Sequence, residues 1–209
     1  MKLYTFPPSP NSVKVLAVIH QLQLPVEVEI VDLTKGESST PEFKAINPNG
    51  KIPTLVDGDF TIWESQAIMR YLAEKHKSDL IPSDLKQRAK MDQWLSWHIA
   101  HFGPAVGAIV WERVAPRFFE GYQTDEHALS KGLTNLERFA PVLEAHLAGR
   151  KFVVGDQPTL ADLALASVLI HIETAQVPVT QYRNLMEWYG RVLALPYFQA
   201  ALPPAPVNA

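Results

Sequence analysis

Small polar residues gather where a short strand-like run gives way to a helical pattern near the start of the chain. The stretch SPNS (residues 9–12) lies between KLYTF (residues 2–6) and a segment at 12–22 whose apolar residues recur at helical spacing. Serine followed by proline is typical of a helix start, because serine caps free N–H groups and proline suits the first turn. The same N-terminus also offers free N–H groups and partial positive charge to an anion.

Thiol chemistry is one use of that geometry. A thiol held at a helix N-terminus loses its proton more easily, with pKa values of roughly 3.5 to 7.5, and a hydroxyl that donates to the sulfur favours the thiolate further. The chain contains no cysteine, so the sulfur would belong to a ligand. No histidine or lysine is placed locally as a base for Ser9, which favours an electrostatic role over a nucleophilic one. Local physics alone favours Ser9 as a helix cap.

Two later stretches have ligand-binding features of their own. In NPNGKIPTL (residues 47–55), Pro53 comes at the start of a strand, where it cannot donate a ladder hydrogen bond. A cis bond would turn the Ile52 backbone toward a peptide-like ligand, and a plain turn proline is the alternative. Glu64 and Ser65 come at the start of a helix. Ser65 suits a helix cap or a bound carboxylate, and Glu64 suits an ammonium group.

The elements needed to position these residues form two groups. The first 75 residues predict a small α/β unit with expected elements in this order: a strand at 2–6, a helix at 12–22, a strand with one solvated face at 26–33, a short helix near 41–45, a hairpin of 52–56 and 60–63, and a helix from 65. The later pattern is helical throughout, with candidates at about 86–115, 124–147, 159–174 and 183–194 and a short one after Pro196.

These groups predict an α/β domain at 1–76, a linker at 77–86 and an all-α domain at 87–209. The proline-rich end, LPPAPVNA, is expected to be a surface arm.

Composition excludes several classes of protein. The formal net charge of -3 lacks the basic excess that a non-specific nucleic-acid binder needs. No apolar run approaches the roughly 20 residues of a membrane helix, and the N-terminus has no apolar signal core, so we expect a cytoplasmic protein. Without cysteine there is no disulfide or thiolate metal site, and His98 and His101 lack a third ligand, so no metal is expected.

Taken in order, these motifs resemble the glutathione transferase family. SPNS, NPNGKIPTL, the Asp-Gly hairpin, ESQAIMRYLAEK and the later TLADLALASV match it over nearly the whole chain, and SPNSVKV is similar to its serine-type and bacterial nu-like members. The resemblance implies an α/β + all-α fold, with a thioredoxin-like N-terminal domain and an all-helical C-terminal domain. It also implies a cytoplasmic homodimer that serves in detoxification, with glutathione as co-substrate and no metal.

The resemblance also implies residue roles. Ser9 would hold the glutathione sulfur as thiolate, with Asn11 as second candidate and Ser12 as third, whereas Tyr4 lies within the strand and would serve the core. Lys51 would contact the glycine carboxylate, which many family members also reach with a histidine or glutamine where this chain has Ser38. The implied glutathione-binding residues are Ser12, Ser38, Lys51, Ile52, Pro53, Glu64 and Ser65.

A hydrophobic acceptor pocket is expected between the domains, facing Ser9. Its candidate lining residues are His101, Phe102, Ala105, Val106, Ile109 and Trp111, although an aromatic stripe at helical spacing more often belongs to a core. Thr159 and Asp162 fit a capping box, in which each satisfies free helix N–H groups. We therefore expect Asp162→Ala to lower stability by about 1 kcal/mol or more without specifically abolishing catalysis.

The predicted activity is attack of the glutathione thiolate on a hydrophobic electrophile. Two alternatives stay open: glutathione-dependent disulfide reduction or peroxidase activity of the nu-like type, and a binding module without turnover. Activity on hydroxyethyl disulfide compared with aryl halides separates the two enzymes, and failure to bind glutathione at millimolar levels would favour the binding module.

Overall fold

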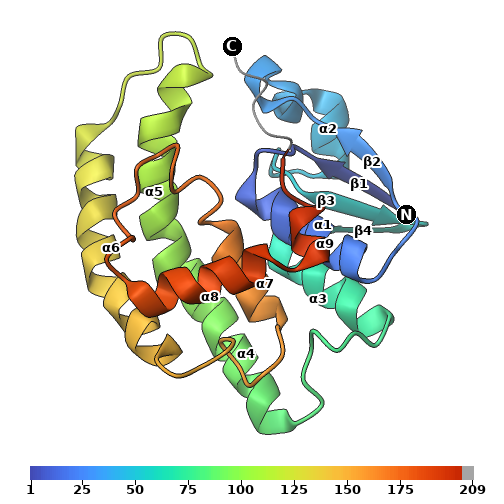
Figure 1. The fold of residues 1–209 in the computed structure, drawn as a ribbon. Coiled ribbons are helices and arrows are strands. Elements are labelled where there is room, and N and C mark those ends of the chain that lie inside the picture. The colour runs from blue at the N-terminus through green and yellow to red at the C-terminus, as the bar shows by residue number, and fades with distance from the viewer. Residues whose placement is uncertain (204–209) are drawn as a thin grey trace. The chain divides into compact units, whose positions relative to one another are not determined.

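The chain divides into two compact units (Figure 1). The computed structural model describes residues 1–203; of the expected surface arm, residues 204–209 lie outside the described residues. The first unit comprises Met1–Ser78 and the described residues from Leu195 onward, and the second is Asp79–Ala194. The helical domain was expected to run to residue 209, but the short helix α9 (Pro196–Gln199) packs on α1 (Pro10–Gln21) and so groups with the first unit.

The first unit is a four-stranded mixed sheet with helices. Its strands are β1 (Lys2–Thr5), β2 (Glu27–Ile30), β3 (Thr54–Asp57) and β4 (Phe60–Trp63), in the order β2-β1-β3-β4. Besides α1 and α9, its α-helices are α2 (Pro41–Ile46) and α3 (Ser65–Lys75), and short 3-10 turns occupy Leu33–Lys35 and Glu37–Ser39. Leu3 and Leu55 are fully buried in the sheet, and α1 packs against α3. This is the predicted α/β arrangement.

The strand register brings four loops to one edge of this sheet. Thr54, the first residue of β3, pairs with Tyr4 near the end of β1 and with Trp63 at the end of β4. β2 runs parallel to β1, with Ile30 opposite Thr5. Because β3 is antiparallel to both of its neighbours, its start lies beside the ends of the other strands. The loops that carry SPNS, NPNGK and Glu64 therefore leave the sheet at the same edge.

One strand differs from its prediction. The pattern of residues 26–33 predicts one buried face, but every residue of β2 is exposed, with Val28 46% and Ile30 49% accessible. β2 is an edge strand with β1 as its one neighbour in the sheet, so its alternating pattern did not ensure a buried face. Tyr4, on β1, meets the ring of Phe43 in α2 edge-on at 5.9 Å, in agreement with its predicted role in the strand.

The second unit is helical, and residues 79–194 contain no strand. Its α-helices are α4 (Leu85–Trp97), α5 (Gly103–Val114), α6 (Glu126–Leu147), α7 (Leu160–Ser167) and α8 (Arg183–Leu193). The predicted helix at 86–115 is interrupted by a π-helical turn, His98–Phe102, just before Pro104. Proline has no N–H to continue the α-helical pattern, and the turn accommodates the break. α7 ends at Ser167, earlier than the predicted 174.

Asp162 is the polar centre of this unit and has no exposed surface. Its carboxylate accepts from the Val153 N–H and the Trp188 Nε1 at 2.8 Å each, and from the Thr159 N–H and hydroxyl at 2.8 and 2.9 Å. The predicted capping box is therefore confirmed: the Thr159 side chain accepts from the backbone N–H of Asp162, and the Asp162 carboxylate accepts from the Thr159 N–H. The Thr159 hydroxyl also donates to that carboxylate. Burial raises the pKa of Asp162, and its hydrogen bonds oppose that shift.

Candidate active site

Ser9 occupies the N-cap position of α1 in an extended conformation, with φ -76° and ψ 126°. Its carbonyl accepts from the N–H groups of Ser12 and Val13 at 2.9 and 3.0 Å, so its backbone starts the helix. Within residues 1–203 its side chain makes no capping hydrogen bond. The hydroxyl of Ser9 therefore lies at a helix N-terminus without serving as the cap, and the capping explanation does not account for it.

Ser12 and Asn11 have different roles in the same loop. Ser12 is fully buried, and its Oγ accepts from the Phe6 N–H at 3.2 Å, which ties the loop back to the end of the strand. Asn11 is exposed, and its Oδ1 accepts from the Ser65 hydroxyl at 3.3 Å. That bond joins residues 54 positions apart and links the SPNS loop directly to the start of α3.

The loop before β3 has the backbone geometry that the sequence left open. The Ile52–Pro53 bond is cis. Asn47, 2% exposed, donates from Nδ2 to the Lys51 carbonyl at 2.6 Å and to the Thr54 hydroxyl at 3.0 Å, which fixes the turn. Lys51 itself is exposed. Sequence reasoning did not assign this role to Asn47, although an asparagine opening a Pro-Asn-Gly turn is a signal for such side-chain bonding.

Ser38 lies against this loop through its backbone. Gly50 has a φ of +60°, and a Cβ at that position would meet the Ser38 carbonyl oxygen at 2.8 Å. Glycine is therefore required twice over, for its backbone angle and for the close approach. The structure thus brings Ser38 beside residues 47–51, as the predicted site needs.

Glu64 is held in a conformation that side chains avoid. Its φ is 71° and its ψ is 112°, at the N-cap of α3, and its side chain is exposed. Such a backbone costs about 1–3 kcal/mol and is found most often at functional sites. The adjacent Ser65 is 9% exposed.

Lys14 is a feature that the sequence analysis did not identify as functional. It is 2% exposed on α1, and burial lowers its pKa to about 7 while the Glu64 carboxylate acts to raise it. A lysine between Val13 and Val15, on a helix stretch that is entirely buried, was the available signal. It adds a buried cationic group near Glu64.

Together these groups suit a zwitterionic peptide-like ligand. The N-termini of α1 and α3 lie at the edge of the sheet where the loops meet, and each favours negative charge. The exposed Lys51 can bind a carboxylate, and the exposed Glu64 can bind an ammonium group. The cis Ile52–Pro53 bond directly follows Lys51 in the chain.

The six predicted acceptor residues, all in the second unit, fall into two sets. Phe102, Ala105, Val106 and Ile109 are at most 1% exposed. Ala105 and Ile109 approach Gly132 of α6, so these α5 residues pack within the helical unit. His101 and Trp111 are exposed, and the His101 ring stacks on Phe139 at 4.8 Å.

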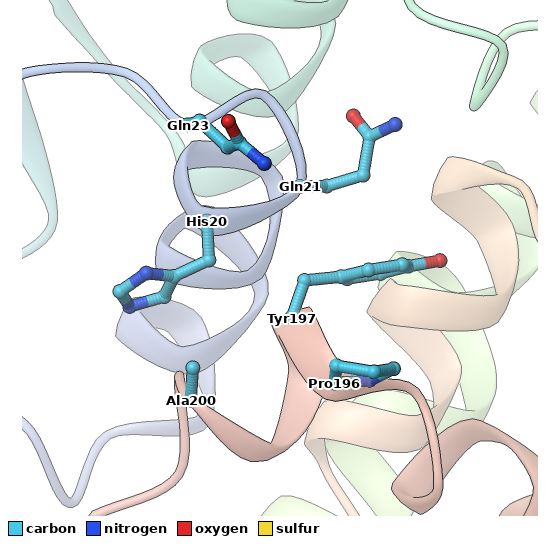
Figure 2. Close-up of a pocket in the computed structure, with 6 residues that line it drawn as sticks. All are labelled: His20, Gln21, Gln23, Pro196, Tyr197 and Ala200. Atoms are coloured by element: carbon cyan, nitrogen blue, oxygen red, sulfur yellow. The ribbon is translucent and has the colours of Figure 1, made fainter.

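A separate hollow in the first unit, of about 320 Å³, lies at the other end of α1 (Figure 2). It is lined by His20, Gln21, Gln23, Pro196, Tyr197 and Ala200. Ser9 immediately precedes the 12-residue α1, so about 18 Å of helix separates the two places. This hollow is therefore not part of the candidate site.

The described residues contain neither a metal-binding cluster nor a membrane-spanning helix. Among residues 1–203 there is no cluster of three or more metal-binding side chains. Within the same range, no helix combines the length and apolar character needed to cross a membrane.

Comparisons with known proteins agree with the geometry. Residues 1–74 match the model of the glutathione S-transferase N-terminal domain, and residues 99–196 match that of the C-terminal domain. Glutathione S-transferase 3 of Zea mays is 38% identical, and the match covers 100% of this chain and 98% of the relative.

Two solved structures have the same fold. Glutathione transferase F7 from Populus trichocarpa aligns with a TM-score of 0.88 at 31% identity, covering 96% of each chain. A glutathione transferase from Pseudomonas putida, solved with one glutathione disulfide per subunit, aligns at 0.86 with 27% identity over 98% of this chain and 91% of its own. These matches confirm the thioredoxin-like and helical domains, and the chain is an enzyme that belongs to the glutathione S-transferase family.

Proposed function

We propose that this enzyme joins glutathione to a hydrophobic electrophile, with Ser9 as the group that holds the sulfur as thiolate. One observation carries the assignment of Ser9. Its hydroxyl stands at the N-terminus of α1 without a capping bond in the described chain, while its carbonyl starts the helix. The glutathione disulfide bound by the Pseudomonas putida relative supports glutathione as the ligand.

In the proposed complex, glutathione lies along the loop before β3. The backbone of Ile52 pairs with its cysteinyl part, and Lys51 contacts the glycine carboxylate on the side where Ser38 lies. Glu64 takes the γ-glutamyl ammonium group, and Ser65 with the N-terminus of α3 takes the neighbouring carboxylate. Pro53 keeps the Ile52 backbone turned toward the ligand.

The reaction then needs little further chemistry from the protein. The Ser9 hydroxyl and the partial positive charge at the N-terminus of α1 stabilise the negative sulfur, which attacks the electrophilic carbon. The new S–C bond forms as the leaving group departs with its electrons. Asn11 is two residues after Ser9, and its Oδ1 accepts from the Ser65 hydroxyl, so we assign it to orientation of the loop. Its Nδ2 is the second candidate donor to the sulfur. Ser12 is omitted from the sulfur contacts because its side chain is fully buried, where its hydroxyl ties the loop to the Phe6 N–H.

For the electrophile we keep two of the six candidates, because Phe102, Ala105, Val106 and Ile109 are at most 1% exposed. The two with exposed side chains, His101 and Trp111, are the first to substitute. We further propose a cytoplasmic homodimer, as is usual for the family.

Disulfide reduction is the second candidate. It is favoured by Asn11 in the SPN motif and by the glutathione disulfide bound in the Pseudomonas putida relative. Since the chain has no cysteine, glutathione thiols would be the only reductant.

The test is the ultraviolet absorbance of the thiolate as glutathione is added to the wild type, Ser9→Ala and Asn11→Ala, with Ser130→Ala on the exposed face of α6 as control. A hydrogen bond to a charged group contributes about 1.5–3 kcal/mol, so Ser9→Ala should reduce thiolate at neutral pH by about ten- to a hundredfold while glutathione still binds. If Asn11→Ala alone removes the thiolate, disulfide reduction becomes the leading function. If glutathione binds to none of the proteins, the proposal fails.

A further inference from the structure

The helical unit contains a second cavity, of about 380 Å³, that the proposed reaction does not use. It lies between the N-terminal part of α4, the C-terminal end of α6 and the loop at 153–155. Three lining residues, Trp94, Val153 and Val154, are at most 7% exposed and provide an apolar base. The volume falls within the range of about 300–1,000 Å³ that small ligands occupy.

The polar lining of this cavity is cationic. Lys86, Lys90 and Arg150 are exposed around it, and none of its ten lining residues is an Asp or Glu. Within residues 1–203, none of these three side chains takes part in an ion pair. In a chain with 22 acidic and 19 basic residues, this is a local excess of unneutralised positive charge.

The nearby carboxylates of Asp84 and Asp162 accept hydrogen bonds from groups other than these three cations. Asp84 accepts from the Gln87 N–H at 2.9 Å and caps α4. Asp162 is fully buried and accepts its four hydrogen bonds from backbone and side-chain donors of its own unit. The Lys90 ammonium instead donates to the Gln93 amide oxygen at 3.0 Å, which leaves its positive charge in place.

His146 lies close enough to these cations to feel their charge. Its Nε2 lies 2.8 Å from the Val153 carbonyl oxygen, and its ring lies 4.4 Å from the ring of Trp94. Burial lowers the pKa of His146, and the positive charges of Arg150 and Lys90 lower it further. Both cations are therefore within electrostatic reach of the imidazole, which itself lines the cavity.

We infer that this cavity binds the phosphate group of a small phosphorylated molecule, or free phosphate, between Lys86, Lys90 and Arg150. A guanidinium fork matches two phosphate oxygens, and ammonium groups serve as point charges for the rest. The amide side chains of Gln87 and Gln93 add neutral hydrogen-bonding capacity. The apolar base formed by Trp94, Val153 and Val154 would receive the carbon part of a phosphate ester.

Isothermal titration calorimetry in a phosphate-free buffer of constant ionic strength tests the inference. The probes are inorganic phosphate, phenyl phosphate and the neutral benzyl alcohol. The protein is compared with the triple variant Lys86→Gln, Lys90→Gln, Arg150→Gln, and with a control triple that loses the same charge at exposed sites elsewhere, Lys77→Gln, Arg117→Gln, Lys131→Gln. Circular dichroism verifies that each variant is folded.

We expect phenyl phosphate to bind the wild type and the control alike, and the cavity triple more than tenfold more weakly, since each exposed charge contributes up to about fivefold. If inorganic phosphate binds as tightly as phenyl phosphate, the free ion is a sufficient ligand. If it binds more weakly, the ligand is a phosphate ester. Either result supports a phosphate site. Four results would overturn the phosphate site. Phenyl phosphate could bind the cavity triple as tightly as the wild type, or bind the control triple as weakly as the cavity triple. Benzyl alcohol could bind as tightly as phenyl phosphate, or neither phosphate could bind.

A second readout is the pKa of His146 followed by proton NMR, with the His146→Gln spectrum assigning the signal. A phosphate dianion near Lys90 and Arg150 offsets the positive charges that lower this pKa. The effect of Asp162, which raises the pKa, stays the same. The pKa should therefore rise when phenyl phosphate is added to the wild type. An unchanged pKa at saturating phenyl phosphate would contradict binding in this cavity.

Discussion

Asp162→Ala should destabilise the helical unit far more than a lost helix cap. The substitution removes the acceptor of four buried donors: the N–H groups of Val153 and Thr159, the Thr159 hydroxyl and the Trp188 indole. Each buried donor left without a partner costs about 1–3 kcal/mol. Removing the carboxylate also removes the free-energy cost of burying its charge, which is what raises its pKa. We therefore take about 1 kcal/mol for each of the four donors, about 4 kcal/mol in all.

Urea unfolding followed by circular dichroism, with linear extrapolation, measures this loss. For a chain of this size, about 4 kcal/mol corresponds to a fall in Tm of about 8–16 °C. The matched control is Asp156→Ala, at an exposed aspartate of the loop before α7, which should leave Tm nearly unchanged. Trp188→Phe removes one of the four donors and keeps the other three bonds, so the lost bond should cost about 1–2 kcal/mol. Since Trp188 is fully buried, the smaller ring also leaves a cavity that adds to this cost.

The sign of the pH dependence provides an independent check. Because burial raises the pKa of Asp162 above 3.8, the folded protein binds this proton more tightly than the unfolded chain does. The stability that this group contributes is therefore present in acid and decreases as pH rises from about 3.8 through the raised pKa. Asp162→Asn cannot titrate and should lack that decrease.

Two outcomes would refute this reasoning. The first is an Asp162→Ala protein whose Tm stays within about 2 °C of the wild type, which would mean that the buried donors find other partners. The second is a protein of unchanged stability that has lost conjugation, which would move Asp162 from folding to catalysis.

Two further predictions concern the glutathione edge. Lys14 has a pKa of about 7 when folded and 10.5 when exposed, so stability should rise by about 4–5 kcal/mol between pH 7 and 10.5. Lys14→Met should lack that rise in urea titrations across this range, and an equal rise in the variant would contradict the buried charge. Glu64→Gly and Glu64→Ala both remove the carboxylate and should both raise the KM for glutathione. Glycine adopts a φ of 71° without strain, so Glu64→Gly should be about 1 kcal/mol more stable than Glu64→Ala, and equal unfolding midpoints would show that the backbone is not strained.

The sequence predicted the order of elements well because the apolar period changes clearly from two to 3.6. The hairpin strand at 60–63 and the helix from 65 to 75 occur where expected, since Asp-Gly and Ser65 mark their boundaries. Burial was less predictable. β2 has the alternation of a half-buried strand, but an edge position depends on strand order, which no local pattern of residues 26–33 contains.

The candidate site was predictable in composition and much less so in its contacts. The order of the motifs was enough to choose Ser9, Lys51, Glu64 and Ser65 as candidate site residues. The strand register brings the loops that carry them to one edge of the sheet. The bond between Ser65 and Asn11 spans 54 residues and follows only from the packed fold. The burial of Lys14 likewise depends on how α1 packs against α3.

The loop that begins the helix shows why a cap and a thiolate site can share one sequence. The Ser9 carbonyl accepts from two N–H groups of α1, so the helix starts without the Ser9 side chain. Ser12 uses its hydroxyl to fix the loop to Phe6, and Pro10 has no N–H to satisfy. The turn is thus held by the Ser9 carbonyl and by residues next to Ser9. We propose that the Ser9 hydroxyl binds a ligand instead. If this division is correct, Ser12→Ala should lower stability by about 1 kcal/mol with thiolate formation retained, the reverse of the effect of Ser9→Ala.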